Sequence, residues 1–173
     1  MSYSVSIKIG NVVEEEADFI VNASNTKLLL GSGVSMAFKR HCGVALQKEM
    51  TQILNDMGGK LSQGSVILTS SATATNFKYA LHAAVISYNK EDSKNPTLST
   101  IKLCLKNIEQ ILISKNPSHK IKLALPLMGC GVGGLDKKDI IKLYKAFFAK
   151  DIAIDVDVVI YGYSQDDFYL LNR

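Results

Sequence analysis

The chain has 173 residues, 47% of them hydrophobic, which is long enough to bury one core and short for two. Its formal net charge of +4 is mild. The basic residues are scattered, and the densest cluster, 115–122, contains no aromatic residue, so the composition argues against a nucleic-acid-binding protein. No repeat or low-complexity tract divides the sequence, and we expect a single domain over residues 1–173.

The cysteines and the N-terminus indicate the cellular compartment. Cys42, Cys104 and Cys130 lie far apart without C-x-x-C spacing, which argues against a disulfide framework or a zinc site. The first ten residues lack the basic and apolar regions of a signal peptide, and no apolar run approaches the roughly 20 residues that span a bilayer. We therefore expect a cytoplasmic protein with no membrane partner, no metal and no other cofactor.

Strand and helix patterns alternate along the chain. Alternating apolar and polar residues predict a half-buried strand at 5–9, and a short acidic turn or single helical turn follows at 13–18. Apolar runs predict further strands at 19–21, 65–69, 79–86, 123–126 and 152–161. Periodicity and end signals predict helices at 35–41, 44–57, 97–115, 137–150 and 164–171, the last with Ser164 as its N-cap. This order predicts an α/β fold with a mostly parallel sheet and helices on both faces.

Two glycine-rich loops follow predicted strands and precede predicted helices. The strand at 19–21 is expected to end at a polar corner, 22–25, because short polar side chains bond the local backbone. The sequence Gly31-Ser32-Gly33-Val34 then leads into a helix, and residues 129–134 hold the same place after the strand at 123–126. Such loops offer unpaired N–H groups and the positive end of a helix dipole. Two of them at the carboxyl edge of one sheet predict a cleft for a nucleotide diphosphate.

At these residues the sequence resembles the macrodomains, a family that binds ADP-ribose. The family's Asn-Ala-Ala-Asn corner corresponds to Asn22-Ala23-Ser24-Asn25, its Gly-Gly-Gly-Val loop to residues 31–34, and its second phosphate loop to residues 129–134. The resemblance covers about residues 7–161. It implies a three-layer α/β/α sandwich with a mixed, mostly parallel central sheet. It also implies that the chain binds ADP-ribose or an ADP-ribosylated protein or small molecule.

The resemblance assigns ligand contacts to particular residues. Asn25 would hydrogen-bond the distal ribose, since a carboxamide both donates and accepts, and Asn22 would brace the corner. Asn11, with Val12 beside it, would contact adenine; the family usually has an aspartate at Asn11, and a neutral amide is a weaker acceptor. A turn role after Gly10 is the alternative for Asn11. The diphosphate would be held by Gly31, Ser32, Gly33, Val34, Gly129, Cys130, Gly131, Val132 and Gly133.

Three other features of the sequence have competing interpretations. Tyr161 and Tyr163 would form an aromatic wall for adenine or pack at the strand end. A helix N-terminus after the second loop would lower the pKa of the Cys130 thiol, but no histidine base stands near it in sequence. We therefore interpret Cys130 as a small residue in a tight loop. His82 lies in a strongly apolar strand, and we interpret it as a packed core residue.

The sequence lacks the acid–base residues of the family's hydrolytic branches. One branch places an aspartate and a histidine where this chain has Ser35 and Lys39. Another uses a lysine in the strand matching 79–86 and an aspartate in the second loop, and this chain has neither. A route without such groups needs only Asn25 and a water oriented by the ligand's diphosphate. Three functions stay open: an ADP-ribose-binding module with at most weak hydrolysis, a mono-ADP-ribosyl hydrolase or O-acetyl-ADP-ribose deacetylase, and, with least support, a nucleic-acid-binding module.

Overall fold

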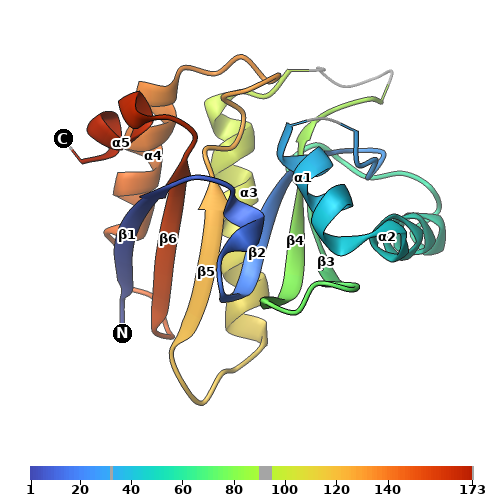
Figure 1. The fold of residues 1–173 in the computed structure, drawn as a ribbon, viewed down its shortest axis with the longest axis horizontal. Coiled ribbons are helices and arrows are strands. Elements are labelled where there is room, and N and C mark those ends of the chain that lie inside the picture. Colours follow the sequence, from blue (N-terminus) through green and yellow to red (C-terminus); the bar gives the residue numbers. More distant parts are fainter. Residues whose placement is uncertain (32, 90–94, 173) are drawn as a thin grey trace.

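The computed structural model describes residues 1–31, 33–89 and 95–172. These residues form one six-stranded sheet with helices on both faces (Figure 1). The strands are β1 (Tyr3–Ile9), β2 (Ala17–Asn25), β3 (Val66–Ser70), β4 (Phe77–Ile86), β5 (Ile121–Pro126) and β6 (Val156–Gly162). A short 3₁₀ helix, η1 (Val12–Glu14), precedes β2, and the α-helices are α1 (Gly33–Cys42), α2 (Val44–Asp56), α3 (Leu98–Ser114), α4 (Lys137–Phe148) and α5 (Gln165–Leu171).

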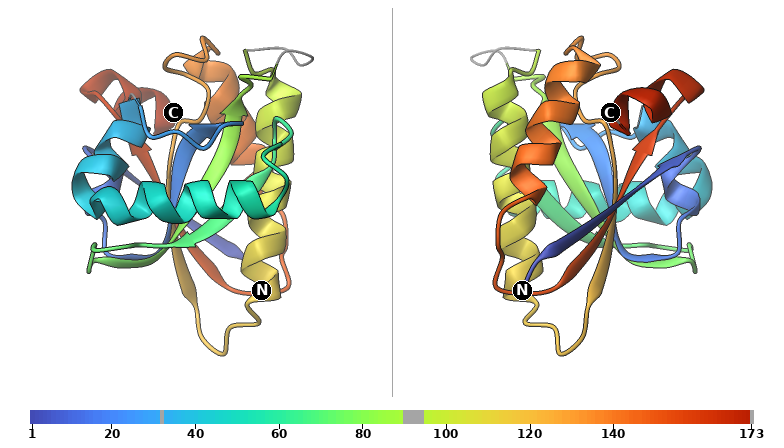
Figure 2. Two further views of the ribbon diagram at one scale, coloured as in Figure 1. Left: turned by 90° about the vertical axis from the view of Figure 1, so that its right-hand side faces the viewer. Right: turned by 90° about the vertical axis from the view of Figure 1, so that its left-hand side faces the viewer.

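The strand order is β1-β6-β5-β2-β4-β3, and every neighbouring pair is parallel except β3–β4 at one edge. Helices α1 and α2 cover one face and α3 and α4 the other, so the molecule has three layers (Figures 1 and 2). The predicted three-layer α/β/α sandwich with a mixed, mostly parallel sheet is confirmed.

Two apolar clusters join the layers, one on each face of the sheet. Alternate residues of β2 point to opposite faces: Phe19 and Val21 belong to the cluster beneath α3 and α4, and Ile20 to the cluster beneath α1 and α2. A strand covered on both faces reads as a continuous apolar run rather than an alternating one. This is why the sequence marks β2, β4 and β5 by short apolar stretches.

The polar segment 22–25 is not the corner that the sequence predicted, because β2 continues through it to Asn25. Asn22 lies opposite His82 of β4 in the parallel register, and the two buried side chains hydrogen-bond each other. This partner satisfies the amide, so the strand has no reason to end there. The only irregularity in the described β2–β4 pairing is a register shift between Ser24 and Asn25.

Other element boundaries differ from the sequence prediction by a few residues. Helix α1 begins at Gly33, and β6 begins at Val156 instead of residue 152. The buried Ile152 instead donates its N–H to the carbonyl of Met1. Strand β1, predicted to be half-buried, is an edge strand in which only Tyr3 is buried. The predicted N-cap Ser164 is confirmed: its Oγ accepts from the N–H of Asp167 in a capping box.

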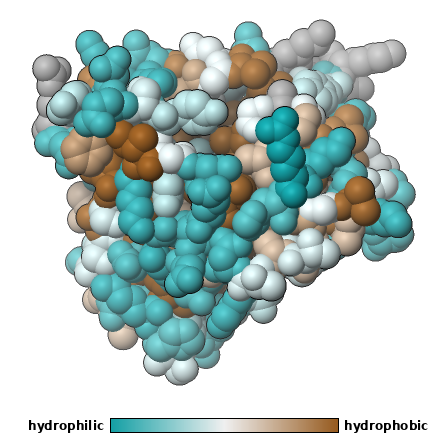
Figure 3. Space-filling model, viewed as in Figure 1, coloured by the Kyte–Doolittle hydropathy of each residue, from teal (hydrophilic) through white to brown (hydrophobic). Residues whose placement is uncertain are grey.

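Hydrophilic side chains occupy the part of the sheet face that α1 and α2 leave open, over β1, β6 and β5 (Figure 3). Several of these side chains contact Glu15, which is only 6% exposed. The Glu15 carboxylate forms ion pairs with Lys8 at 2.8 Å and Lys122 at 3.1 Å, and it accepts a hydrogen bond from the hydroxyl of Tyr161 at 2.8 Å. These partners hold the pKa of Glu15 below its usual value despite the opposing effect of burial.

In the described ranges, no helix has both the length and the apolar character needed to cross a bilayer.

Candidate functional site: a cleft between two glycine-rich loops

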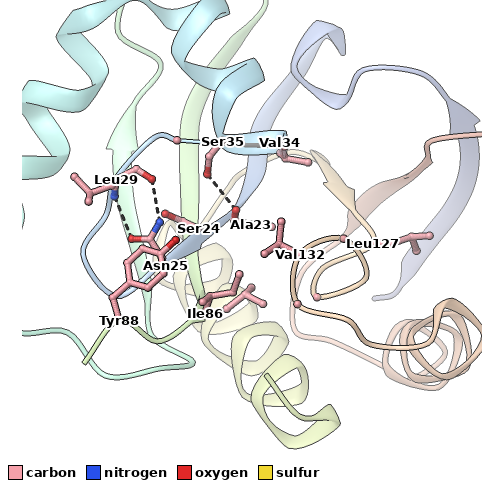
Figure 4. Close-up of a pocket in the computed structure, with 16 residues that line it drawn as sticks. Ala23, Ser24, Asn25, Leu29, Val34, Ser35, Ile86, Tyr88, Leu127 and Val132 are labelled. Carbon is pink, nitrogen blue, oxygen red and sulfur yellow. Dashed lines mark hydrogen bonds between the residues drawn. The ribbon is translucent and has the colours of Figure 1, made fainter. Parts of the chain in front are cut away.

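A cleft lies at the carboxyl edge of the sheet, where the loops after β2 and β5 meet. The two strands are parallel neighbours, with Phe19 opposite Leu123, so the segments that follow them emerge on the same side. The cleft has a volume of about 280 Å³. Its lining comes from both loops and from the end of β4 (Figure 4): Ala23, Ser24, Asn25, Leu29, Gly31, Gly33, Val34, Ser35, Val85, Ile86, Tyr88, Leu127, Gly129, Gly131, Val132 and Gly133.

Two carboxamides hold the first loop in place. The Oδ1 atom of Asn25 accepts from the N–H groups of Lys27 and Leu29 at 3.0 and 3.2 Å, and its Nδ2 donates to the carbonyl of Leu29 at 3.0 Å (Figure 4). From α2, Gln47 bonds the carbonyl of Leu28 and the N–H of Leu30, each at 2.8 Å. Leu28 is fully buried at a φ of 51°, which is uncommon for a branched residue. Residues 27–30, which lead into Gly31, are therefore held in place by these bonds before any ligand arrives.

These bonds restrict what Asn25 can offer a ligand. Both lone pairs of Oδ1 and one N–H of Nδ2 are engaged within its own loop, which is the geometry of an Asx turn. One N–H of the carboxamide remains. The side chain that the resemblance assigns to the distal ribose can thus donate to a ligand oxygen from this geometry.

A buried hydrogen-bond chain supports the start of α1. Ser35 donates its hydroxyl to Asn22 Oδ1 at 3.0 Å, Asn22 Nδ2 lies 3.0 Å from His82 Nδ1, and His82 Nε2 lies 2.8 Å from Thr69 Oγ1. Because an amide nitrogen can only donate, Nδ1 of His82 accepts and Nε2 carries the proton. Burial lowers the pKa of His82 to about 3, so the ring is neutral at physiological pH. The interpretation of His82 as a packed core residue is confirmed.

The second loop is held by its own backbone. Leu135 donates to the carbonyl of Gly129 at 2.9 Å, and Gly134 to that of Gly131 at 3.1 Å. A Cβ at Gly133 would lie 2.7 Å from the carbonyl oxygen of Gly129, so the turn admits only glycine there. Between these bonds, the N–H groups of residues 131–133 make no hydrogen bond to any residue that the structure describes.

The two helices that follow the loops differ at their N-termini. Asp136 caps α4 by accepting from the N–H groups of Lys138 and Asp139, so that terminus already holds a carboxylate. Gly33 and Val34 of α1, by contrast, line the cleft. A bound anion would meet the dipole of α1 and the N–H groups of both loops.

The described lining contains no charged side chain, and Tyr88 supplies its only titratable group. Lys39 and Arg40 are exposed on α1 and do not line the cleft. An anion in this cleft would therefore be held by backbone dipoles, which suit a phosphate that must be fixed in position rather than merely attracted. The described lining also offers no carboxylate or imidazole that could act as a general base.

Some residues that the sequence assigned to the site lie outside this lining. The side chain of Asn11 caps η1, its Oδ1 accepting from the N–H of Val13 at 3.3 Å, and Val12 is buried. Tyr161 uses its hydroxyl on Glu15, whereas Tyr163 is 86% exposed. Ser32 lies outside the described residues. These assignments stay predictions.

The pKa of the Cys130 thiol differs from the direction expected from the sequence. Its thiol contacts the carbonyl of Met128 at 3.9 Å and does not line the cleft. Burial raises the pKa of the thiol to about 11, whereas a helix N-terminus was expected to lower it. The capping carboxylate of Asp136 contributes to the upward shift, and the ammonium of Lys137 opposes it. The raised pKa keeps Cys130 in its thiol form at neutral pH, which does not favour a role as a nucleophile.

The structure brings in residues that sequence reasoning missed. Ser24, Leu29, Ser35 and Tyr88 line the cleft, and Gln47 holds its first loop. Tyr88 follows β4, which is the neighbour of β2, so its position after a strand that ends at the same edge was an available signal. Gln47 left no such signal, because its contact depends on how α2 packs.

Comparisons with known proteins agree on one family. The Macro domain model matches residues 21–144. An uncharacterised protein of Saccharolobus solfataricus is 34% identical, covering 72% of this chain and 65% of that protein. A macro domain-containing protein of Listeria monocytogenes is 28% identical, covering 78% and 72%. A mutant Oceanobacillus iheyensis macrodomain solved with ADPR has a TM-score of 0.83 at 23% identity, covering 97% and 89%. The Trypanosoma brucei macrodomain in complex with ADP-ribose has a TM-score of 0.78 at 18% identity, covering 96% and 67%.

Proposed function

The chain belongs to the macrodomain family, and on that premise we propose that it binds ADP-ribose, free or attached to a protein or small molecule. The observation that carries the proposal is one cleft lined by two N–H-rich loops and by no charged side chain among the described residues. Macrodomains solved with ADPR and ADP-ribose share the fold and support the choice of ligand.

In this proposal the diphosphate lies between the loops. Gly31, Gly33 and Val34 would contact it from the α1 side, and Gly131, Val132 and Gly133 from the other. A diphosphate suits this arrangement better than a single phosphate because it has oxygens for two facing sets of N–H donors. The distal ribose would lie near Asn25 and Tyr88, and the adenine would extend beyond the lining toward Asn11 and Tyr161.

The hydrogen bonds of Asn25 favour binding over hydrolysis. To activate an attacking water, a side chain must accept a hydrogen bond from it, and both acceptor sites of Asn25 are engaged within its own loop. The described lining holds no carboxylate or imidazole that could take a proton from the water. A binding module is therefore the better-supported function, and a hydrolase or deacetylase is the second candidate.

Titration calorimetry with ADP-ribose tests the proposal when it compares Gly33→Glu with a matched control, Gly59→Glu. Both glycines have positive φ, 57° and 76°, and neither Cβ would meet an atom within 4 Å, so the backbone strain is similar. Only Gly33 lies in the cleft, where a carboxylate would repel phosphate. We expect saturable binding by the wild type and by Gly59→Glu and none by Gly33→Glu. Absence of wild-type binding at millimolar ligand, or equal binding by both variants, contradicts the proposal.

A further inference from the structure

One buried hydroxyl in the cleft has no hydrogen-bond partner among the residues that the structure describes. Ser24 lies near the end of β2, is 3% exposed and lines the cleft. Its Oγ is the one buried side-chain oxygen or nitrogen, among those that the structure describes, without a hydrogen bond. Figure 4 shows Ser24 with Asn25 and Tyr88 on one side of the view, and Val132 and Leu127 on the other.

Two polar side chains beside Ser24, those of Ser35 and Asn25, have hydrogen-bond partners. Ser35 also lines the cleft, with 4% exposure, and its hydroxyl reaches Asn22 at 3.0 Å and the carbonyl of Ala23 at 3.2 Å. Asn25, the next residue along the chain, makes three hydrogen bonds. The unpartnered hydroxyl is therefore not part of a generally unsatisfied region, because Ser35 and Asn25 beside it are hydrogen-bonded.

A buried hydroxyl without a partner is unfavourable, and native proteins retain few of them. Alanine stands at this place in the Asn-Ala-Ala-Asn pattern that the sequence resembles, and alanine has no hydroxyl. A buried polar atom with no partner among the described residues is accounted for by a ligand that supplies the missing acceptor.

We infer that the hydroxyl of Ser24 is a ligand contact, donating a hydrogen bond to an acceptor oxygen of bound ADP-ribose. The inference rests on the proposed function. The acceptor is either a phosphate oxygen or a hydroxyl of the distal ribose, which share the same hydrogen-bonding chemistry. Ser24 then adds a side-chain contact to a site that otherwise recognises its anion through backbone groups.

Titration calorimetry of ADP-ribose and of ADP with Ser24→Ala tests the inference, with Ser6→Ala on the exposed strand β1 as the matched control. We expect Ser24→Ala to weaken ADP-ribose binding by about 3- to 10-fold, the range of one neutral hydrogen bond. Ser6→Ala should bind like the wild type. An equal loss for ADP places the contact at the diphosphate, and a loss confined to ADP-ribose places it at the distal ribose.

Thermal unfolding separates this role from a structural one. Ser24→Ala removes an unsatisfied group and should melt at the wild-type temperature or above it. Ser35→Ala removes a hydroxyl whose one proton is shared between Asn22 Oδ1 and the carbonyl of Ala23, and it should melt lower. If the wild type binds ADP-ribose and Ser24→Ala binds it equally tightly, the inference is overturned and the proposed function stands. Absence of binding by the wild type overturns both.

Discussion

Acidification from pH 6.5 to 5.0 should destabilise the folded protein through His82, which holds the buried chain beneath α1. His82 is fully buried, accepts at Nδ1 from Asn22 and donates at Nε2 to Thr69. Burial lowers its pKa to about 3 from an ordinary value of 6.5. Between these values the unfolded chain takes up a proton that the folded protein cannot, so each step toward lower pH favours unfolding.

The magnitude follows from the width of the pH interval. One pH unit within the interval is worth about 1.36 kcal/mol, so acidification from pH 6.5 to 5.0 should lower the free energy of unfolding by about 2 kcal/mol. For a domain of this size the melting temperature should fall by about 4–8 °C. The carboxylates of Glu15 and Asp167 have lowered pKa values, and their contribution to stability is lost at still lower pH, below their ordinary values of 4.5 and 3.8. The chosen interval therefore isolates the histidine.

Circular dichroism melts from pH 8 to 5 would measure the effect in the wild type, in His82→Gln and in a control, His119→Gln, at an exposed position. We expect the control to follow the wild type. His82→Gln should be less stable at pH 7 but should show a flatter dependence on pH. Equal slopes in all three proteins would refute the assignment. Imidazole NMR of the wild type provides a second readout, in which the His82 ring should stay neutral down to pH 5.

Three further expectations concern the cleft. Gln47→Ala removes two hydrogen bonds to residues 28–30 and should lower the free energy of unfolding by about 1–3 kcal/mol, measured by denaturant unfolding. It should also weaken ADP-ribose binding in calorimetry, and unchanged binding would mean that the loop does not need this support. Incubation of the protein with ADP-ribosylated protein should show no turnover beyond background; turnover that Asn25→Ala abolishes while binding persists would favour the hydrolase instead. Because no charged side chain lines the described cleft, ADP-ribose affinity should change little between about 50 and about 300 mM salt, and a steep loss would indicate the basic rim that nucleic-acid binding requires.

Features set by local sequence could be predicted for this fold. The glycines before α1 and α4, the N-cap Ser164 and the apolar runs of β2, β4 and β5 each act within a few residues. Their order along the chain was enough to place two loops at one edge of a parallel sheet. The cleft between those loops, with Asn25 and Val132 in its lining, follows from that topology.

The differences from prediction come from long-range partners. Asn22 belongs to a strand rather than a corner because His82, sixty residues away, satisfies its amide. The thiol of Cys130 has a raised pKa because burial dominates and Asp136 caps the helix that follows. Ser24 shows the opposite case: only the full set of contacts reveals that its hydroxyl has no partner among the described residues. Sequence periodicity reports none of these relations.

The central claim is that the two loops together hold a diphosphate. Calorimetric titration of the wild type with AMP, ADP and ADP-ribose tests it directly, since the three ligands share adenosine and differ in the second phosphate and the distal ribose. The account predicts much tighter binding of ADP than of AMP, and tighter binding still of ADP-ribose. ADP that binds no more tightly than AMP would contradict it, because the second loop would then contribute nothing.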